Sequence, residues 1–507
     1  MLKTIKPTGR SSHIGWAAFF GVLLFALHPL RVEPVAWATG RRYVLSGFFL
    51  TAAFWAYLRY CRGNQKKYLL ISWFLFAAGT LSSEISAPAA ILFLLLDSYP
   101  LKRIEREGKK KILIEKIPFV AIGILALALV FFGHRSSGQV MDLHGYDLSY
   151  RWAQAMRAIW HYPWTTLAPV NLSPIYPVPR SIYWNPWSMR YVIESFMTVL
   201  VMGFLWTRRK AWPGLHYAWW SYLILLSPTL GIALTRSFAY DRYAYLATMP
   251  WVTLWSWVLF EYIGWLAPMA RKIIFLGIIG LTGVLAHVSW GQAKIWQNSL
   301  ALWGHANRLY PLSHHTLLNL AQAWDHAKVP EQALAQYENV LKIYPDHPLA
   351  LQGAGKSLMQ INEPAAALAY YQRALQRYRP DALYRHYVAA TLSDAAAALI
   401  GLGLIREAIQ GCQLAIQIEP ALAQAYFQWG YALAVTRRFP EAIDRFEQAL
   451  KQSPNARTHF YLGNAYYATQ KLSLATFHWQ QALRLDPTFS AAQRNLKYSS
   501  SQQSAFE

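Results

Sequence analysis

The chain has 507 residues, of which 55% are hydrophobic and only 14% charged, a composition too apolar for one soluble domain. Residues 1–312 carry a net charge of +20 and residues 313–507 of +3, so the basic excess belongs to the apolar half and favours anionic lipid headgroups or phosphates as partners. No zinc-finger, RNA-binding or helix-turn-helix pattern is present and the two cysteines lie in different halves, which argues against nucleic acid, a disulfide framework and a metal site.

Apolar segments recur along the first 290 residues. A membrane-spanning helix needs about 20 apolar residues, fewer where it is buried among other helices. A small-residue cleavage site does not follow the basic N-terminal residues, so we expect the first segment to be an uncleaved span. We predict an all-α chain that begins with a membrane helix bundle of about nine spans, near 14–30, 43–60, 68–82, 85–98, 113–133, 189–206, 213–233, 247–266 and 272–290.

Basic clusters predict how this bundle is oriented, because loops rich in Lys and Arg stay in the cytoplasm. If all nine segments cross, clusters within 3–10, 62–67, 102–111, 208–210 and 271–272 share the cytoplasmic side. Clusters flank both ends of 68–98, so this stretch should leave and return as a hairpin with Ser83 and Glu84 at its tip. The 28–42 turn, the 134–188 and 234–246 loops and the C-terminal half would then be extracytoplasmic.

The 28–42 turn carries several ionisable groups at the end of a span. Charge is costly there, so such a group is a functional-site hypothesis by default. Arginines at this depth also extend to lipid headgroups, which is the alternative for all three of them. Glu33 has no headgroup phosphate to contact, so a site is favoured. The residues concerned are His28, Arg31, Glu33, Arg41 and Arg42.

The 134–188 loop is long for a connection inside a compact domain, which indicates a functional element. The 150–162 stretch places Trp152, Met156 and Trp160 near one helical face, as in an interfacial amphipathic helix. The proline- and aromatic-rich stretch from Leu172 to Arg180 should be irregular. Its aromatic residues either line a carbohydrate or lipid site or anchor the chain at the membrane interface.

A second ionisable group lies in the 234–246 loop, at the mouth of a span. Asp241, Arg242 and Tyr243 are adjacent there. The planar guanidinium fork of Arg242 suits a phosphate. The alternative is a structural pair between Asp241 and Arg242.

The C-terminal half is repetitive. Five prolines recur at spacings of 35, 40, 34 and 33 residues, which is typical of tetratricopeptide helix–turn–helix units. Small residues should allow close helix contact while aromatic residues fill the remaining space, and Cys412 takes an aromatic position in the third unit. We predict a connecting half-repeat helix at 291–312, a repeat domain at 313–490 and a polar tail at 491–507. The prolines are Pro345, Pro380, Pro420, Pro454 and Pro487, and the core small residues are Gly355, Ala408, Gly430, Ala442, Gly463 and Ala475.

Four stretches in the membrane half are similar to stretches of one family. They are His28-Pro-Leu-Arg-Val-Glu33 with Gly40-Arg-Arg42, Glu84 after a span, Leu172-Ser-Pro-Ile-Tyr-Pro177, and Asp241-Arg-Tyr-Ala-Tyr-Leu246. Together with the repeats, they resemble the transmembrane and tetratricopeptide-repeat proteins, including protein O-mannosyltransferases of the glycosyltransferase C superfamily. The resemblance implies a multi-span domain over 1–290 that transfers a sugar from a polyprenyl-phosphate donor to protein hydroxyls. The reaction would take place outside the cytoplasm, at the bacterial inner membrane or in the endoplasmic reticulum lumen.

The resemblance also implies roles for the ionisable residues. Glu33 would act as acid/base or orienting group, with Glu84 and Asp241 as further catalytic candidates. Arg31, Arg41, Arg42, Arg242 and Tyr243 would bind the donor phosphate, and His28 would line the cavity. No metal is implied.

One feature of the family is missing. Its members usually begin with a further span and an acidic loop that supplies the general base an inverting transfer requires. We therefore expect a truncated, split or inactive relative. The alternative is a non-catalytic, membrane-anchored repeat scaffold that binds a partner protein.

Overall fold

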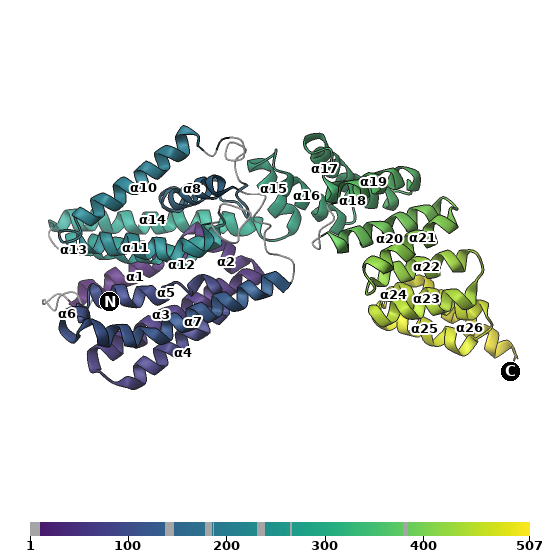
Figure 1. The fold of residues 1–507 in the computed structure, drawn as a ribbon, viewed down its shortest axis with the longest axis horizontal. Helices are drawn as coiled ribbons and strands as arrows, with labels where there is room; N and C mark the ends of the chain where they lie inside the picture. The colour runs from purple at the N-terminus through teal and green to yellow at the C-terminus, as the bar shows by residue number, and fades with distance from the viewer. Residues whose placement is uncertain are drawn as a thin grey trace. The chain divides into compact units, whose positions relative to one another are not determined.

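The computed structural model describes residues 11–136, 147–177, 185, 187–230, 239–263, 266–378 and 384–506. Within these ranges the chain is helical, apart from turns and one isolated antiparallel bridge between Tyr176 and Ala239, so the all-α prediction is confirmed there. The chain divides into two compact units, Met1–Pro311 and Leu312–Glu507 (Figure 1). Each unit is described separately.

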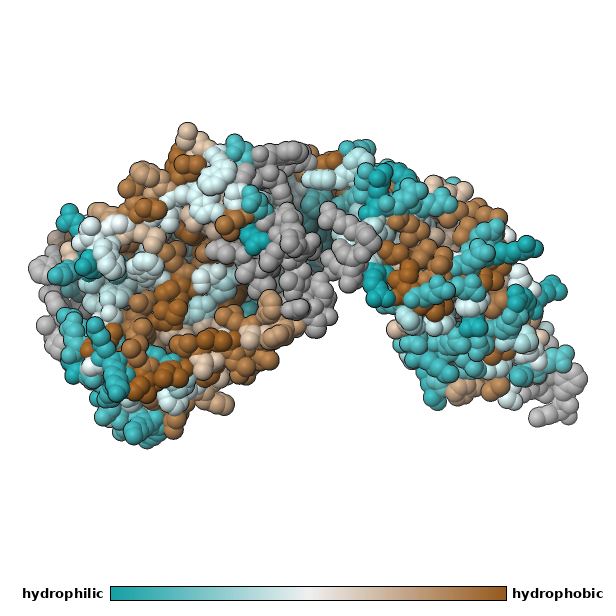
Figure 2. Space-filling view, in the orientation of Figure 1, coloured by the Kyte–Doolittle hydropathy of each residue, from teal (hydrophilic) through white to brown (hydrophobic). Residues whose placement is uncertain are grey.

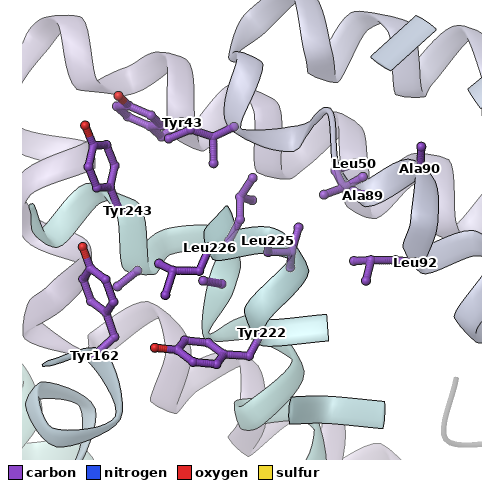
Figure 3. Close-up of a cluster of buried hydrophobic side chains, with 14 of the residues drawn as sticks. Tyr43, Leu50, Ala89, Ala90, Leu92, Tyr162, Tyr222, Leu225, Leu226 and Tyr243 are labelled. Atoms are coloured by element: carbon purple, nitrogen blue, oxygen red, sulfur yellow. The ribbon is translucent and has the colours of Figure 1, made fainter. Parts of the chain in front are cut away.

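The first unit packs its helices around an aromatic and aliphatic core. Figure 3 shows part of this core, to which Tyr43, Leu50, Tyr222, Leu225 and Leu226 belong. Short 3-10 turns separate several of the helices: η2 (Pro29–Arg31), η3 (Ala38–Gly40), η4 (Glu84–Ser86), η6 (Ser227–Thr229) and η7 (Asp241–Tyr243). The α-helices are α1 (Ser11–Leu27), α2 (Val32–Ala36), α3 (Arg41–Gly63), α4 (Lys66–Ser82), α5 (Ala89–Ser98), α6 (Arg103–Glu107), α7 (Lys109–Ser136), α8 (Leu148–Leu167), α10 (Met189–Thr207), α11 (Pro213–Leu226), α12 (Ala244–Ala247), α13 (Met249–Ile263), α14 (Pro268–Ile295) and α15 (Ser299–Leu309).

The prediction of nine spans is not supported. Among the described residues, four helices are long and apolar enough to cross a membrane, or five if one bent pair counts as a single span. The four are Ala38–Gly63, Lys109–Gly133, Met189–Thr207 and Pro268–Ile295, and the bent pair joins Ala18–Leu27 to Pro29–Ala36 at 69°.

The other expected spans form shorter helices. Helices α4, α5, α11 and α13 have 17, 10, 14 and 15 residues. Proline accounts for two of these lengths, because it removes a backbone donor and clashes with the preceding turn. Pro88 and Pro100 flank α5, and Pro228 follows the end of α11.

Much of the apolar surface of the first unit faces outward. Only 22% of the apolar window of α7, and 17% of those of α10 and α14, is buried within the protein. Apolar residues accordingly cover much of this unit in Figure 2. Exposed apolar surface on this scale is typical of a membrane or protein contact.

Helix α3 connects two clusters of charged residues. Its 23 residues give a length of about 35 Å at about 1.5 Å per residue, slightly more than a bilayer core of about 30 Å. Near its start, Arg42 lies 3.8 Å from Glu84. Near its end, the Tyr60 hydroxyl donates to Glu115 at 2.6 Å. The two clusters therefore lie about one membrane thickness apart.

The second unit is a series of antiparallel helix pairs followed by α26. The segment predicted as a polar tail forms most of α26, and its Ala492 is buried against the last pair. The connecting helix predicted at 291–312 corresponds to α15, which falls in the first unit. Pro380 lies outside the described residues. The helices are α16 (His314–His326), α17 (Pro330–Ile343), α18 (Pro348–Gln360), α19 (Pro364–Arg377), α20 (Arg385–Gly401), α21 (Ile405–Ile418), α22 (Ala423–Val435), α23 (Phe439–Gln452), α24 (Ala456–Ala468), α25 (Leu472–Leu485) and α26 (Ser490–Phe506).

Glycines let the two helices of a pair approach closely. A Cβ atom on Gly355 would lie 2.5 Å from the Tyr371 ring, and one on Gly430 would lie 2.8 Å from Phe446. In the third pair, α20 carries Ala396 where these two pairs have glycine, and α21 carries Cys412 where they have the aromatic residue. Cys412 is smaller than an aromatic residue and leaves room for the alanine methyl group. Ala408, Ala442 and Ala475 are fully buried between helices.

Candidate functional site

Glu33 and Arg242 form the centre of the first cluster. The Glu33 carboxylate accepts the main-chain N–H of Arg242 at 2.9 Å, and its other oxygen pairs with the Arg242 guanidinium. Only 2% of Glu33 is exposed. A buried carboxylate requires such compensation, because burying an unpaired charge is costly. The pair joins α2 to η7 across 209 residues of sequence.

Aromatic rings surround the Arg242 guanidinium. Its central carbon lies 3.7 Å from the ring centroid of Tyr240, 5.0 Å from that of Trp37 and 5.2 Å from that of Tyr243. Such contacts stabilise a cation. Burial lowers the pKa of Arg242, but the charge and hydrogen bond of Glu33 and the nearby Tyr243 and Tyr43 together more than offset this effect, and the pKa is raised overall. Arg242 is therefore a fixed positive charge.

Asp241 lies beside this pair and makes a different contact. Its carboxylate accepts a hydrogen bond of 2.6 Å from the Tyr176 hydroxyl. Burial, and then the nearby charge of Glu33, raise the pKa of Asp241 well above its usual range. The predicted alternative of a direct structural pair between Asp241 and Arg242 is not what the structure shows, because Arg242 pairs with Glu33.

Arg31 is the least satisfied cation of the cluster. It is 4% exposed, donates through Nη2 to Thr248, and lies over the Phe25 ring at 4.1 Å. Its Nε and Nη1 donate to no acceptor within the described part of the chain. An unsatisfied buried guanidinium is costly, so Arg31 is the residue here best suited to receive an anionic group.

The remaining predicted residues lie around this core. His28 donates through Nε2 to the Thr166 carbonyl at 3.0 Å and accepts the Leu30 N–H at Nδ1. Arg42 donates to the Tyr43 hydroxyl at 2.9 Å and lies 3.8 Å from Glu84. Arg41 is exposed at the first position of α3 and makes no ion pair with a described residue. The structure therefore brings Glu33, Asp241, Arg242 and Tyr243 together, with Arg31 nearby, and leaves Arg41 outside.

Sequence reasoning missed some of the residues that hold this cluster. The Tyr176 hydroxyl donates a hydrogen bond to Asp241, and the Thr248 hydroxyl accepts one from Arg31. The Tyr162 hydroxyl donates to the Tyr240 carbonyl at 3.1 Å and accepts the Tyr240 N–H at 3.3 Å. The stretch around Tyr176 was noticeable for its prolines, but nothing in it indicates a carboxylate partner 65 residues away.

A second buried ionic network lies at the other end of α3. Arg103 is 2% exposed and donates to Asp97 at 3.2 Å and to Glu115 at 3.0 Å. Asp97 also pairs with Lys116 at 2.6 Å and accepts the Tyr57 hydroxyl. The 102–111 cluster was interpreted only as an orientation signal, so this network was not predicted.

The described residues offer no metal site. No group of three His, Cys, Asp or Glu side chains within them could hold an ion, and the prediction made no metal assignment. Glu33 and Arg242, with Asp241 and Tyr176 beside them, instead form two pairs of carboxyl, guanidinium and phenol groups.

The first helices of the repeat pairs form one continuous side of the second unit. Contacts join α16 to α18, α18 to α20, α20 to α22 and α22 to α24. In a curved stack the elements on the inner side are closest to one another, so these helices line the concave side. Asp394 links three of them, because it accepts hydrogen bonds from Gln352 at 2.9 Å and from Gln424 at 2.8 Å.

This concave side carries an excess of positive charge. The first helices α16, α18, α20, α22 and α24 carry two carboxylates, and neither is exposed. Asp325 is half-buried and accepts a hydrogen bond of 2.6 Å from the Tyr337 hydroxyl. Asp394 is buried and lies 3.3 Å from Lys356. The exposed guanidinium of Arg457 lies over the Phe427 ring at 4.8 Å. Arg385 is exposed at the start of α20. An acidic segment is the complementary partner for such a surface.

The tetratricopeptide repeat pattern matches residues 323–382 and 427–495. The second unit is a tetratricopeptide-repeat array. None of the curated proteins matches the chain. The match is confined to the repeats and gives no support to the resemblance to O-mannosyltransferases.

Several solved structures are similar to the tetratricopeptide-repeat array. YrrB, described as a TPR protein with an unusual peptide-binding site, is 20% identical over 38% of this chain and 97% of its own, with a TM-score of 0.28. TTC0263, a thermophilic TPR protein of Thermus thermophilus, is 20% identical over 37% of this chain and 98% of its own, with a TM-score of 0.33. A tetratricopeptide repeat protein from Parabacteroides merdae is 16% identical over 44% and 83%, with a TM-score of 0.35. Because these identities and TM-scores are low, the assignment of the second unit rests on the match to the tetratricopeptide repeat family.

Tetratricopeptide-repeat arrays present extended concave surfaces for partner proteins. The second unit is therefore a protein-interaction module. Its buried small residues and aromatic partners build the stack, and its concave side is the surface available for binding.

Proposed function

We propose that the chain is a membrane-anchored scaffold that binds an extended, acidic protein segment through its tetratricopeptide repeats. The repeat match supports protein binding, and the charge of the concave side supports an acidic partner. The apolar outward faces of α7, α10 and α14 support anchoring in a membrane. The observation that carries the proposal is that the two carboxylates of the first helices α16, α18, α20, α22 and α24, Asp325 and Asp394, are not exposed, whereas Lys356, Arg385 and Arg457 are exposed.

Site-specific photo-crosslinking tests where a partner binds. A photoreactive residue is placed at Tyr387, which is 38% exposed on the first helix α20, in the full chain produced in its membrane. The matched control position is Leu414, which is 50% exposed on the second helix α21. We expect protein adducts at Tyr387 and few at Leu414. Equal adduct yields at both positions would contradict binding on the concave side.

Charge reversal tests the acidic character of the partner. Arg457→Glu places a carboxylate on the concave side and should reduce the Tyr387 adduct about tenfold, because like charges repel across an interface. Arg484→Glu makes the same change on the second helix α25, where the side chain is also exposed. A similar loss with both variants would point to a general charge effect and not to this surface.

Sugar transfer is the second candidate function. It is favoured by the gathering of Glu33, Asp241 and Arg242 from distant stretches, with Arg31 nearby, at one end of α3. In this reading Arg31 neutralises the phosphate of a polyprenyl-phosphate sugar, and Glu33 holds Arg242 in position. The reaction would take place on the extracytoplasmic side. The pairing of Glu33 with Arg242 counts against Glu33 as a free general base.

A donor-dependent transfer assay separates the two functions. Purified chain in proteoliposomes is given a polyprenyl-phosphate sugar and an acceptor protein, alone and with an upstream extension that supplies an acidic loop. Sugar transfer by either chain that is lost in the Glu33→Gln variant would support the transferase function. No transfer by either chain, together with crosslinking at Tyr387, would leave the scaffold as the function.

A further inference from the structure

A groove opens beside the second ionic network, at the starts of α4 and α7. It has a volume of about 790 Å³. Its floor is apolar and includes Leu69, Leu70, Trp73 and Ile114, and Lys66, Lys110 and Lys111 lie around it. Neither the repeats nor the Glu33 cluster involves these residues.

The positive charge of this groove is only partly neutralised. Of its two carboxylates, Glu115 pairs with Arg103 at 3.0 Å, and Glu107 pairs with Lys111 at 2.8 Å. Lys66 and Lys110 are exposed and form no ion pair with any described residue. Two cations therefore remain available at the groove.

Two helix N-termini add to this positive potential. Helix α4 begins at Lys66 and helix α7 at Lys109. The first N–H groups of a helix have no partner within the helix, and the helix dipole makes this end attractive to anions. Phosphate groups bind in such places, particularly beside lysine.

The apolar floor continues along both helices beyond the groove. On α4, Leu70 and Phe74 are 57% and 72% exposed. On α7, Ile114 and Ile117 are 55% and 61% exposed, and α7 is a candidate span. A ligand here meets cations and helix N-termini at one end and exposed hydrocarbon at the other, which matches an amphiphile.

We propose that this groove binds an anionic glycerophospholipid, with its phosphate at Lys66 and Lys110 and an acyl chain along α4 and α7. The proposal rests on the membrane anchoring proposed above. Juxtamembrane basic residues attract anionic lipids by roughly 1 kcal/mol each, but that attraction alone is diffuse. The groove adds apolar contact and fixed donors, so it should select one lipid at one site.

Native mass spectrometry of the full chain in mild detergent, with added lipid, measures this selection. Phosphatidylglycerol and phosphatidylcholine with the same acyl chains are the probes. We expect one phosphatidylglycerol to be retained at least tenfold more tightly than phosphatidylcholine. Lys66→Gln with Lys110→Gln should reduce that preference about tenfold. Lys67→Gln with Lys109→Gln, which changes neighbouring lysines that do not line the groove, should have little effect.

Three results would overturn the proposal. They are equal retention of the two lipids, equal loss in both double variants, and displacement of phosphatidylglycerol by glycerol phosphate at the same concentration. The last would show a phosphate site without a lipid contribution. Reconstitution in nanodiscs separates the two proposals: a chain that inserts but selects no lipid contradicts the groove alone. A chain that does not insert contradicts the membrane anchoring and this proposal together.

Discussion

The Glu33 carboxylate accepts two hydrogen bonds from a single residue, Arg242, one from its main-chain N–H and one from its guanidinium. The two residues are 209 positions apart in the chain, and Glu33 is almost fully buried. The contact fixes η7 against α2 and places Arg242 among the rings of Trp37, Tyr240 and Tyr243. Stability of this part of the first unit therefore depends on the pair.

Removing both charges of this pair should destabilise the first unit by less than the two single removals added together. Glu33→Gln leaves Arg242 buried without a counter-charge and should destabilise the first unit by about 3–5 kcal/mol. In Glu33→Gln with Arg242→Met, neither residue leaves the other's charge without its partner, so the loss should be smaller than the sum of the single losses by about 1–3 kcal/mol. Thermal unfolding in detergent measures all three variants. Additive losses would show that the pair is not coupled.

The Arg103 network should respond in the same way at the other end of α3. Arg103→Met leaves Asp97 and Glu115 buried without this partner and should cost about 3–5 kcal/mol. Arg103→Lys should be intermediate, because an ammonium cannot reproduce the planar fork. Lys111→Gln, which removes an exposed pair with Glu107, is the control and should cost less than about 1 kcal/mol. An equal loss from Arg103→Met and Lys111→Gln in the same unfolding measurement would be incompatible with the network.

The glycine–aromatic contacts predict position-dependent effects of one substitution. In Gly463→Ala, the new Cβ would lie 2.6 Å from the Trp479 indole, so the variant should lose about 1–3 kcal/mol of repeat stability. In Gly411→Ala, the nearest atom is 3.6 Å away, and the helix gains the better propensity of alanine. Gly411→Ala should therefore be neutral or stabilising. Denaturant unfolding of residues 312–507 gives both values, and a reversed order would exclude the close contact.

The histidine pair of the last repeat predicts a pH dependence. His459 Nδ1 lies 3.0 Å from His478 Nδ1, so one of the two must carry a proton and the other must accept it. Burial lowers the pKa of both rings, and in His478 burial and the neighbouring His459 lower the pKa to about 4. Unfolded histidines titrate near 6.5. Between pH 6.5 and about 4 the unfolded chain therefore binds protons that the folded chain does not, and stability falls as the pH falls.

Melting temperatures of residues 312–507 between pH 7.5 and 5 measure this effect. We expect a decrease toward low pH that is smaller in His478→Phe, which retains a ring stacked on Tyr466 but removes the titrating group. A variant with the same pH dependence as the natural chain would show that other groups are responsible.

Local patterns in the sequence predicted the repeats because each unit is built from contacts close in sequence. The pairing of Gly430 with Phe446, for example, recurs at the same spacing as that of Gly463 with Trp479. The first unit was harder to predict. Glu33, Asp241 and Arg242 were identified individually, but their partners depend on packing between distant segments, as the Glu33–Arg242 and Asp241–Tyr176 contacts show. Nine spans are not supported because hydropathy does not show where prolines limit a helix, as Pro88 does before α5 and Pro228 does after α11.

The central claim is that the first unit lies in a membrane with the two ends of α3 on opposite faces. In a chain with Cys61 and Cys412 replaced, single cysteines at Arg41 and Arg62, both exposed, are tested with a membrane-impermeant maleimide on sealed vesicles. We predict that one position reacts in intact vesicles and the other reacts only after the vesicles are opened. Reaction of both positions in intact vesicles would contradict the claim.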